Sequence, residues 1–299
     1  MRQLVFIHGR AQEHKDSIAL KKEWLDAFRE GLEKSGLDLP IPEPDVRFPY
    51  YGQTLFDLLA GLSPEQAAKI IIRGTDAQEG EQLPEEERRL IEAVLEEVLR
   101  QEGITQEQIA AEIGGEVVQR GPLNWGWVQA ILKVIDRHVP GGSGTSIALF
   151  THDAYQYITN TRIRRLINEG VRQAITPGVP TVVVGHSLGS VVAYNLLQKE
   201  GAQRGWEVPL FVTLGSPLGI TKMKEMLAPI EHPACVGTWF NAMDERDVVA
   251  LYPLNRKHFP IDPEIENKTD VRNHTQNRHG ISGYLNDPEV ARRIYDALD

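Results

Sequence analysis

Residues 181–197 read TVVVGHSLGSVVAYNLL, and this segment indicates the fold of the chain most clearly. The β-branched run from Thr181 to Val184 predicts a short buried strand. The apolar positions that follow recur with the spacing of a helix: Val191, Val192, Tyr194 and Leu197. Because only a glycine-rich turn separates the two elements, the sequence predicts a sharp strand-turn-helix unit with Ser187 at its apex.

A serine at this apex has the surroundings that a nucleophile requires. A hydroxyl is a weak nucleophile, so it needs a general base nearby and hydrogen-bond donors for the charge that develops on the substrate oxygen. Gly185 and Gly189 leave room where the strand and the helix pack closely. The N-terminus of the following helix directs unsatisfied N–H groups toward Ser187. The turn therefore predicts a nucleophilic serine.

The segment GHSLG at residues 185–189 resembles the nucleophile elbow of the α/β-hydrolase superfamily, in its lipases and esterases. The resemblance covers the chain roughly from Arg2 to Tyr50 and from Thr181 to Leu298. It implies an α/β fold with a mostly parallel central sheet flanked by helices. Because the strand that carries His-Gly begins at Leu4, the resemblance implies a trimmed α/β-hydrolase sheet.

The middle of the chain departs from this pattern, because residues 53–144 predict helices and polar loops without a strand. Pro84 begins one predicted helix, and Thr105 with Gln108 has the spacing of a capping box for another. We therefore divide the chain into a core domain of residues 1–52 and 145–299 and an inserted helical cap of residues 53–144.

Composition and charge limit the class of protein. The 299 residues are 41% hydrophobic, which suffices for a sizeable core, and the single cysteine excludes an internal disulfide. The net charge of −10 comes from Asp76 to Gln119, which holds 13 acidic and 3 basic residues. The sequence has neither a run of about 18 apolar residues nor a signal-peptide pattern. We expect a soluble, cytoplasmic protein without a transmembrane segment that does not bind nucleic acid.

The first predicted strand, Leu4 to Ile7, ends in His8-Gly9-Arg10. In the lipases and esterases that the chain resembles, such a His-Gly strand end supplies part of the oxyanion hole. The resemblance assigns the backbone N–H groups of Arg10 and Leu188 to this hole and gives His8 a structural role in shaping the loop.

The family order is serine, then acid, then histidine. A predicted strand at residues 237–241 is followed by an acidic turn that ends in Asp247 and two valines. The resemblance points to Asp247 as the acid that orients the histidine. Asp244 is the main alternative in the same turn, and Glu245 also remains open.

The segment HGISGYL at residues 279–285 resembles the C-terminal loop that carries the family's catalytic histidine. A histidine suits this role because it titrates near neutral pH and can both take and return the hydroxyl proton. The resemblance assigns the base to His279. His274 lies close enough in the sequence to remain an alternative.

Together these residues predict a serine hydrolase that cleaves a small-molecule or lipid carboxylic ester through a Ser187–His279–Asp247 triad and an acyl-enzyme intermediate. We expect no cofactor, and without a His-Glu-x-x-His motif or a cysteine cluster we assign no metal. Hydrolysis of a thioester or an amide by the same triad is one alternative. A non-catalytic ligand receptor on the same fold is another. The sequence does not define the oligomeric state.

Overall fold

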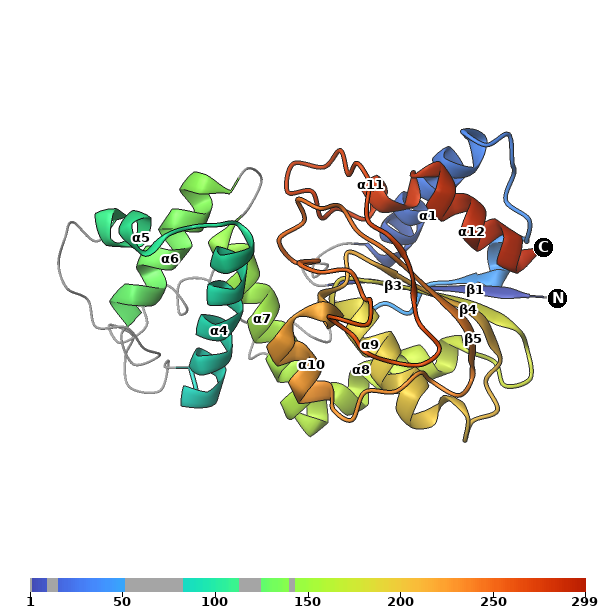
Figure 1. Ribbon diagram of the computed structural model, residues 1–299. Helices are drawn as coiled ribbons and strands as arrows, with labels where there is room; N and C mark the ends of the chain where they lie inside the picture. Colours follow the sequence, from blue (N-terminus) through green and yellow to red (C-terminus); the bar gives the residue numbers. More distant parts are fainter. Residues whose placement is uncertain (1, 10–15, 52–82, 113–124, 140–142) are drawn as a thin grey trace.

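The structure, a computed structural model, describes residues 2–9, 16–51, 83–112, 125–139 and 143–299. Within these residues six strands form one sheet, all parallel, in the order β2-β1-β3-β4-β5-β6 (Figure 1). The strands are β1 (Gln3–Ile7), β2 (Val46–Arg47), β3 (Thr181–His186), β4 (Val208–Leu214), β5 (Val236–Ala242) and β6 (Glu266–Lys268). The predicted α/β architecture with a parallel central sheet is confirmed.

Helices cover both faces of the sheet because alternate residues of each strand point to opposite sides. On β1, Leu4 and Phe6 share a hydrophobic core with α1, α11 and α12, whereas Val5 and Ile7 share the other core with α7, α8 and α9. The two layers lie above and below the sheet in Figure 1. The described helices of these layers are α1 (Ser17–Glu33), α7 (Gly144–Thr159), α8 (Thr161–Ala174), α9 (Leu188–Leu196), α10 (Thr221–Leu227), α11 (Ser282–Leu285) and α12 (Pro288–Leu298).

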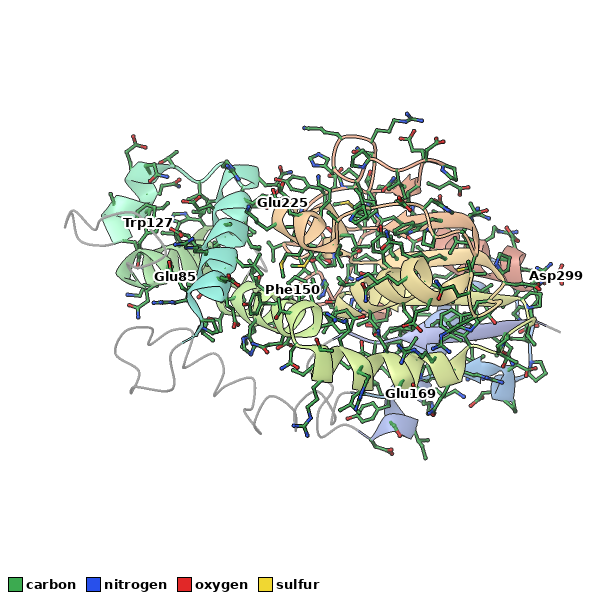
Figure 2. All side chains as sticks on the ribbon, turned by 90° about the horizontal axis from the view of Figure 1, so that it is seen from below. Glu85, Trp127, Phe150, Glu169, Glu225 and Asp299 are labelled. Carbon is green, nitrogen blue, oxygen red and sulfur yellow. The ribbon has the colours of Figure 1, made fainter. Side chains whose placement is uncertain are left out.

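Three further helices, α4 (Glu85–Gln101), α5 (Gln106–Glu112) and α6 (Trp125–His138), form a group beside the sheet layers (Figure 1). They belong to the region predicted as a cap. Phe150 of α7 is buried and lies between this group and the layers around the sheet (Figure 2). The apolar side chains of α4 and α6 continue into the core that contains α7. Residues 52–82 lie outside the described residues, so the boundaries of the cap stay a prediction.

Side chains cap the starts of several helices, and the capping box predicted from Thr105 and Gln108 is confirmed. The Asp16 carboxylate accepts a hydrogen bond from the first turn of α1, and Asp287 accepts two from the first turn of α12. Thr105 and Gln108 form a reciprocal capping box at α5, with side-chain to backbone distances of 2.7 and 3.3 Å. Residues next to each helix start therefore define where these helices begin.

The start of α9 lies directly against the end of β1. A Cβ atom at Gly189 would lie 2.1 Å from the carbonyl oxygen of Ile7, and one at Gly185 would lie 2.7 Å from the Cα of Ser190. Real Cβ atoms do not approach backbone atoms this closely. Glycine is therefore required at both positions for the strand, the turn and the helix to meet.

Replacing Gly189 with alanine is expected to destabilise the fold by about 3–5 kcal/mol, because the new methyl group forces β1 and α9 apart. Gly170→Ala is the matched control, since a Cβ at Gly170 of α8 would meet nothing within 4 Å. Alanine there is expected to stabilise by about 0.5–1 kcal/mol. Urea unfolding measures both free energies, and equal midpoints for the two variants would contradict the packing described.

Candidate active site

The carboxyl ends of β1 and β3 meet where the strand order reverses. β1 pairs with β2 on one side and with β3 on the other. The chain after β1 therefore adds β2 at one edge of β1, and the later strands extend the sheet from the opposite edge. In open parallel sheets the crevice at such a switch point is where ligands bind. β1 ends just before His8-Gly9, and β3 ends just before Ser187. The predicted nucleophile therefore lies at the position that the topology favours for a ligand.

Ser187 adopts a backbone conformation that few residues other than glycine adopt, with φ 54° and ψ −127°. Its N–H donates to the carbonyl of Leu214 at 3.1 Å, and the Ser190 hydroxyl donates to its carbonyl at 2.6 Å. Gly9 closes the other side, because a Cβ atom there would lie 2.8 Å from the Cβ of Ser187. The contacts of the turn hold Ser187 in this strained conformation.

Of the two backbone N–H groups predicted for an oxyanion hole, the structure describes that of Leu188. Leu188 is the first residue of α9, so its N–H belongs to the end of the helix where N–H groups have no acceptor within the helix. The helix dipole adds partial positive charge at the same place. Arg10, the other predicted donor, lies outside the described residues. His8 is buried, and its Nε2 accepts from the N–H of Tyr51 at 3.0 Å, which ties the end of β1 to the chain after β2.

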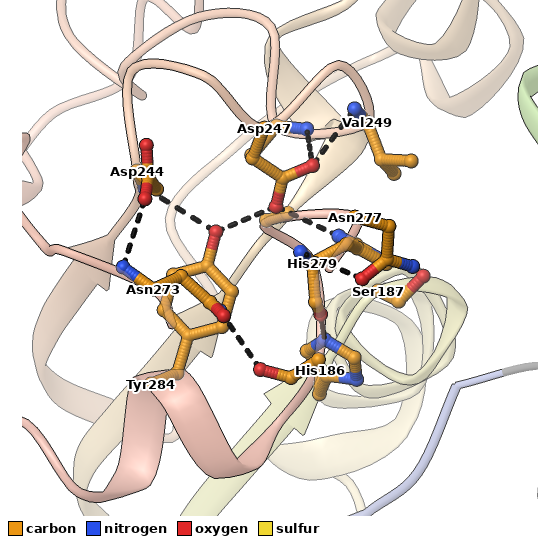
Figure 3. Close-up of polar contacts among 12 residues, drawn as sticks. His186, Ser187, Asp244, Asp247, Val249, Asn273, Asn277, His279 and Tyr284 are labelled. Carbon is orange, nitrogen blue, oxygen red and sulfur yellow. Dashed lines mark hydrogen bonds and ion pairs between the residues drawn. The ribbon is translucent and has the colours of Figure 1, made fainter. Parts of the chain in front are cut away.

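Asp247 and His279 form a hydrogen-bonded pair, with 2.7 Å between Oδ2 and Nδ1 (Figure 3). Burial alone would raise the pKa of this carboxyl, but the charge of His279 and hydrogen bonds from His279, Tyr284 and Val249 hold the pKa below its ordinary value. Asp247 is therefore ionised at neutral pH and accepts hydrogen bonds only. The proton of a neutral His279 consequently lies on Nδ1, which leaves Nε2 as an acceptor.

Asp244 makes a different set of contacts. Its carboxylate accepts hydrogen bonds from the backbone N–H groups of Arg246, at 2.8 Å, and Asn273, also at 2.8 Å. Asn273 in turn donates from its side chain to the carbonyl of Gly280 and accepts from Thr275, so the carboxylate braces the loop that carries His279 (Figure 3). The structure thus pairs His279 with Asp247 and gives Asp244 bonds to the backbone.

The remaining alternatives lie at the surface. Glu245 and His274 are both exposed. The nearest polar partner of His274 is the side chain of Asn286, at 3.5 Å. Neither residue contacts the Asp247–His279 pair in the hydrogen bonds of the described chain.

Ser187 and His279 both flank the carboxyl end of β4. The backbone of Ser187 bonds to Leu214, and a Cβ atom at the next residue, Gly215, would lie 3.2 Å from Cε1 of His279. Among the described side chains, no hydrogen bond joins Ser187 Oγ to the His279 ring. Such bonds are often long before substrate binds and tighten in the reacting complex.

His186 joins the elbow to the loop of the histidine. Its Nε2–H donates to the backbone carbonyl of His279 at 2.7 Å, and the two ring centroids lie 4.8 Å apart. Burial and the charge of His279 lower the pKa of His186 to about 3, so it stays neutral. The residue stands within the GHSLG motif, but nothing in the motif predicts this contact.

Tyr284 is a second residue that the sequence did not predict for the site. It is fully buried in α11, and its hydroxyl donates to Oδ2 of Asp247 at 2.5 Å (Figure 3). The partners are 37 residues apart in the chain, and no spacing rule connects them. Only the fold brings this phenol to the carboxylate.

Cys235 is the single cysteine of the chain and is partly buried. Burial raises the pKa of the Cys235 thiol to about 11, so it is not a thiolate at neutral pH. Within the described ranges, histidine, cysteine and acidic side chains form no group of three suited to a metal ion. In the same ranges, no helix combines the length and the apolar character needed to span a bilayer.

Comparisons of the chain with protein-family models, with curated proteins and with solved structures gave no match.

Proposed function

We propose that the protein is a serine hydrolase of the α/β-hydrolase type that cleaves a carboxylic ester of a small molecule or lipid. The observation that carries the proposal is the convergence of a strained serine and a histidine–carboxylate pair at the carboxyl end of one parallel sheet. Ser187, Asp247 and His279 also follow one another in the chain order of that superfamily.

In the proposed acylation step, Nε2 of His279 takes the proton of Ser187 while Oγ attacks the carbonyl carbon of the ester. Nε2 can accept the proton because Nδ1 donates to Asp247. Negative charge moves to the carbonyl oxygen, where the N–H of Leu188 and the N-terminal end of α9 stabilise it. The intermediate then collapses, the alcohol leaves with the proton from His279, and the acyl group remains on Ser187.

In the proposed deacylation step, a water molecule gives a proton to His279 and attacks the acyl carbon. Collapse of this second intermediate releases the carboxylic acid and returns the proton to Ser187. Asp247 stays ionised throughout and stabilises the imidazolium that forms in each step. One ester and one water are consumed per cycle.

A fluorophosphonate probe is expected to label the wild-type protein at Ser187 and to leave Ser187→Ala unlabelled, because an activated hydroxyl is needed to displace the fluoride. Ser216→Ala is the control. Ser216 is also buried at a strand end, but its Oγ lies 2.8 Å from the Ser190 hydroxyl and accepts from the N–H of Leu218. Peptide mapping of the adduct identifies the labelled residue.

The nucleophile, the type of bond cleaved and the catalytic role itself are each open to test. Labelling that persists at another serine in Ser187→Ala would show that the nucleophile is wrong. An ester, a thioester and an amide of one acyl group, compared by kcat/KM, distinguish the three bond types. A folded wild-type protein that resists the probe, and whose melting temperature rises with a ligand that it does not convert, would favour a receptor.

A further inference from the structure

We propose that Tyr284 is a positioning residue of the proposed triad, which holds the Asp247 carboxylate in the orientation that His279 needs. This inference rests on the proposed function. The Tyr284 hydroxyl and His279 Nδ1 both bond to the same oxygen, Oδ2, at 2.5 and 2.7 Å (Figure 3). The other oxygen, Oδ1, accepts from the backbone N–H groups of Val249 and Ala250, which belong to the same loop as Asp247.

The direction of the Tyr284 hydrogen bond is fixed by its second partner. The hydroxyl oxygen accepts from the backbone N–H of Asp244 at 3.3 Å, so its single proton is free to point to Asp247. Burial and the negative charge of Asp247 raise the pKa of Tyr284 well above its usual range. Tyr284 is therefore a protonated donor at neutral pH.

Gly215 lies where the side chains of Tyr284, Asp247 and His279 pack together, and it has no side chain to displace them. Gly215 has φ 55°, and a Cβ atom there would lie 3.0 Å from the Tyr284 ring, 3.1 Å from Oδ2 of Asp247 and 3.2 Å from the His279 ring. The phenol, the carboxylate and the imidazole thus form one packed unit. Two groups from outside the loop of Asp247 donate to Oδ2, His279 Nδ1 and the Tyr284 hydroxyl. Loss of the hydroxyl would leave His279 alone in this role.

The second donor on Oδ2 also affects the charge that faces His279. A hydrogen bond from Tyr284 disperses part of the negative charge of the carboxylate, so the imidazolium is stabilised less than it would be by a carboxylate without this bond. The other titratable groups near this unit are His186, whose ring packs on His279, Asp244 behind the Tyr284 hydroxyl, and His8, which interacts electrostatically with His186. None of them donates a hydrogen bond to Oδ2.

The test compares Tyr284→Phe with Tyr194→Phe. Tyr194 is a buried tyrosine of α9 whose hydroxyl also makes two hydrogen bonds: it donates to the backbone carbonyl of Glu231 and accepts from the backbone N–H of Glu231. We expect Tyr284→Phe to lower kcat about tenfold with KM unchanged, because the hydroxyl bonds to the triad rather than to substrate. The acidic limb of the kcat/KM profile is expected to move to higher pH. Tyr194→Phe is expected to leave both properties at the wild-type value.

A second substitution and a spectroscopic measurement cover the case in which Tyr284→Phe does not fold. Incorporation of 3-fluorotyrosine at position 284 keeps the shape and the acceptor for Asp244 but makes the hydroxyl a stronger donor, so the acidic limb is expected to move to lower pH. The NMR resonance of the His279 Nδ1 proton, identified by its loss in His279→Gln, is expected to shift in both Tyr284 proteins and not in Tyr194→Phe.

The outcomes separate this inference from the proposed function. If wild type hydrolyses esters but the Tyr284 and Tyr194 proteins have equal kcat, equal pH profiles and an unchanged Nδ1 proton resonance, Tyr284 is only a packing residue and the inference is wrong. If wild type hydrolyses no ester and resists the fluorophosphonate, the proposed function is wrong. The Nδ1 proton resonance then still decides whether Tyr284 acts on the Asp247–His279 pair.

Discussion

His279→Gln is expected to lower kcat for ester hydrolysis about 10⁶-fold, because glutamine cannot take a proton from Ser187 or return it to the leaving alcohol. The substituted side chain is similar in size, and His279 is partly exposed, so the fold is expected to persist. Initial rates on a chromogenic short-chain ester, with the melting temperature measured alongside, test this expectation.

The matched control for this substitution is His274→Gln, five residues earlier in the same loop. His274 is exposed, so its replacement is expected to leave kcat within about twofold of wild type and stability within about 0.5 kcal/mol. If His274→Gln instead lost activity while His279→Gln retained it, the assignment of the base to His279 would be wrong.

The second large effect is expected for Asp247→Asn, with a fall in kcat of about 10⁴-fold. An asparagine amide can present N–H groups to Nδ1, which favours the tautomer with the proton on Nε2 and so blocks proton transfer from Ser187. The substituted side chain also loses the charge that stabilises the imidazolium. The measurement is kcat across the pH range in which the variant stays folded.

Asp244→Asn is the control for Asp247→Asn, because it makes the same chemical change three residues away. Asp244 bonds only to backbone N–H groups in the described contacts of its carboxylate, at Arg246 and Asn273. Its replacement is expected to cost about 1–3 kcal/mol in the free energy of unfolding and to change kcat far less. A greater loss of kcat in Asp244→Asn than in Asp247→Asn would reverse the assignment of the acid.

Local signals in the sequence were sufficient to predict much of the fold. The run from Thr181 to Val184 lies in β3, and Val191, Val192 and Tyr194 lie in α9, with Leu197 directly after its end. These signals work because β-branched runs and capping residues act over a few residues. The parallel arrangement of the strands was implied by the resemblance of residues 185–189 to the α/β-hydrolase nucleophile elbow.

The edge of the sheet was not predicted. β6 consists of Glu266, Asn267 and Lys268, a polar sequence without the pattern of a strand. Its conformation depends on pairing with β5 and on the Asn267 side chain, which accepts from the N–H of Leu254 and from Asn241. These partners lie far apart in the chain, so no local pattern reveals them.

In the candidate site, too, some residues could be predicted from local sequence, whereas other contacts depend on the complete fold. Ser187 was predicted from its own turn, whereas Asp247 and Asp244 stand in one acidic turn where composition alone does not distinguish them. The contacts of Asp244 with Asn273 and of Tyr284 with Asp247 span 29 and 37 residues. Such contacts exist only after the chain has folded, and they were therefore beyond prediction from the sequence.

Because Asn273 braces its loop, the backbone around His279 is already ordered in the folded protein before a ligand binds. Asn273 is fully buried, and its hydrogen bonds to Gly280 and Thr275 close the loop around His279. Fixing a backbone residue costs about 1–2 kcal/mol of conformational entropy. For this loop that entropy is lost when the protein folds, so the imidazole is pre-organised and an arriving ligand does not have to order it.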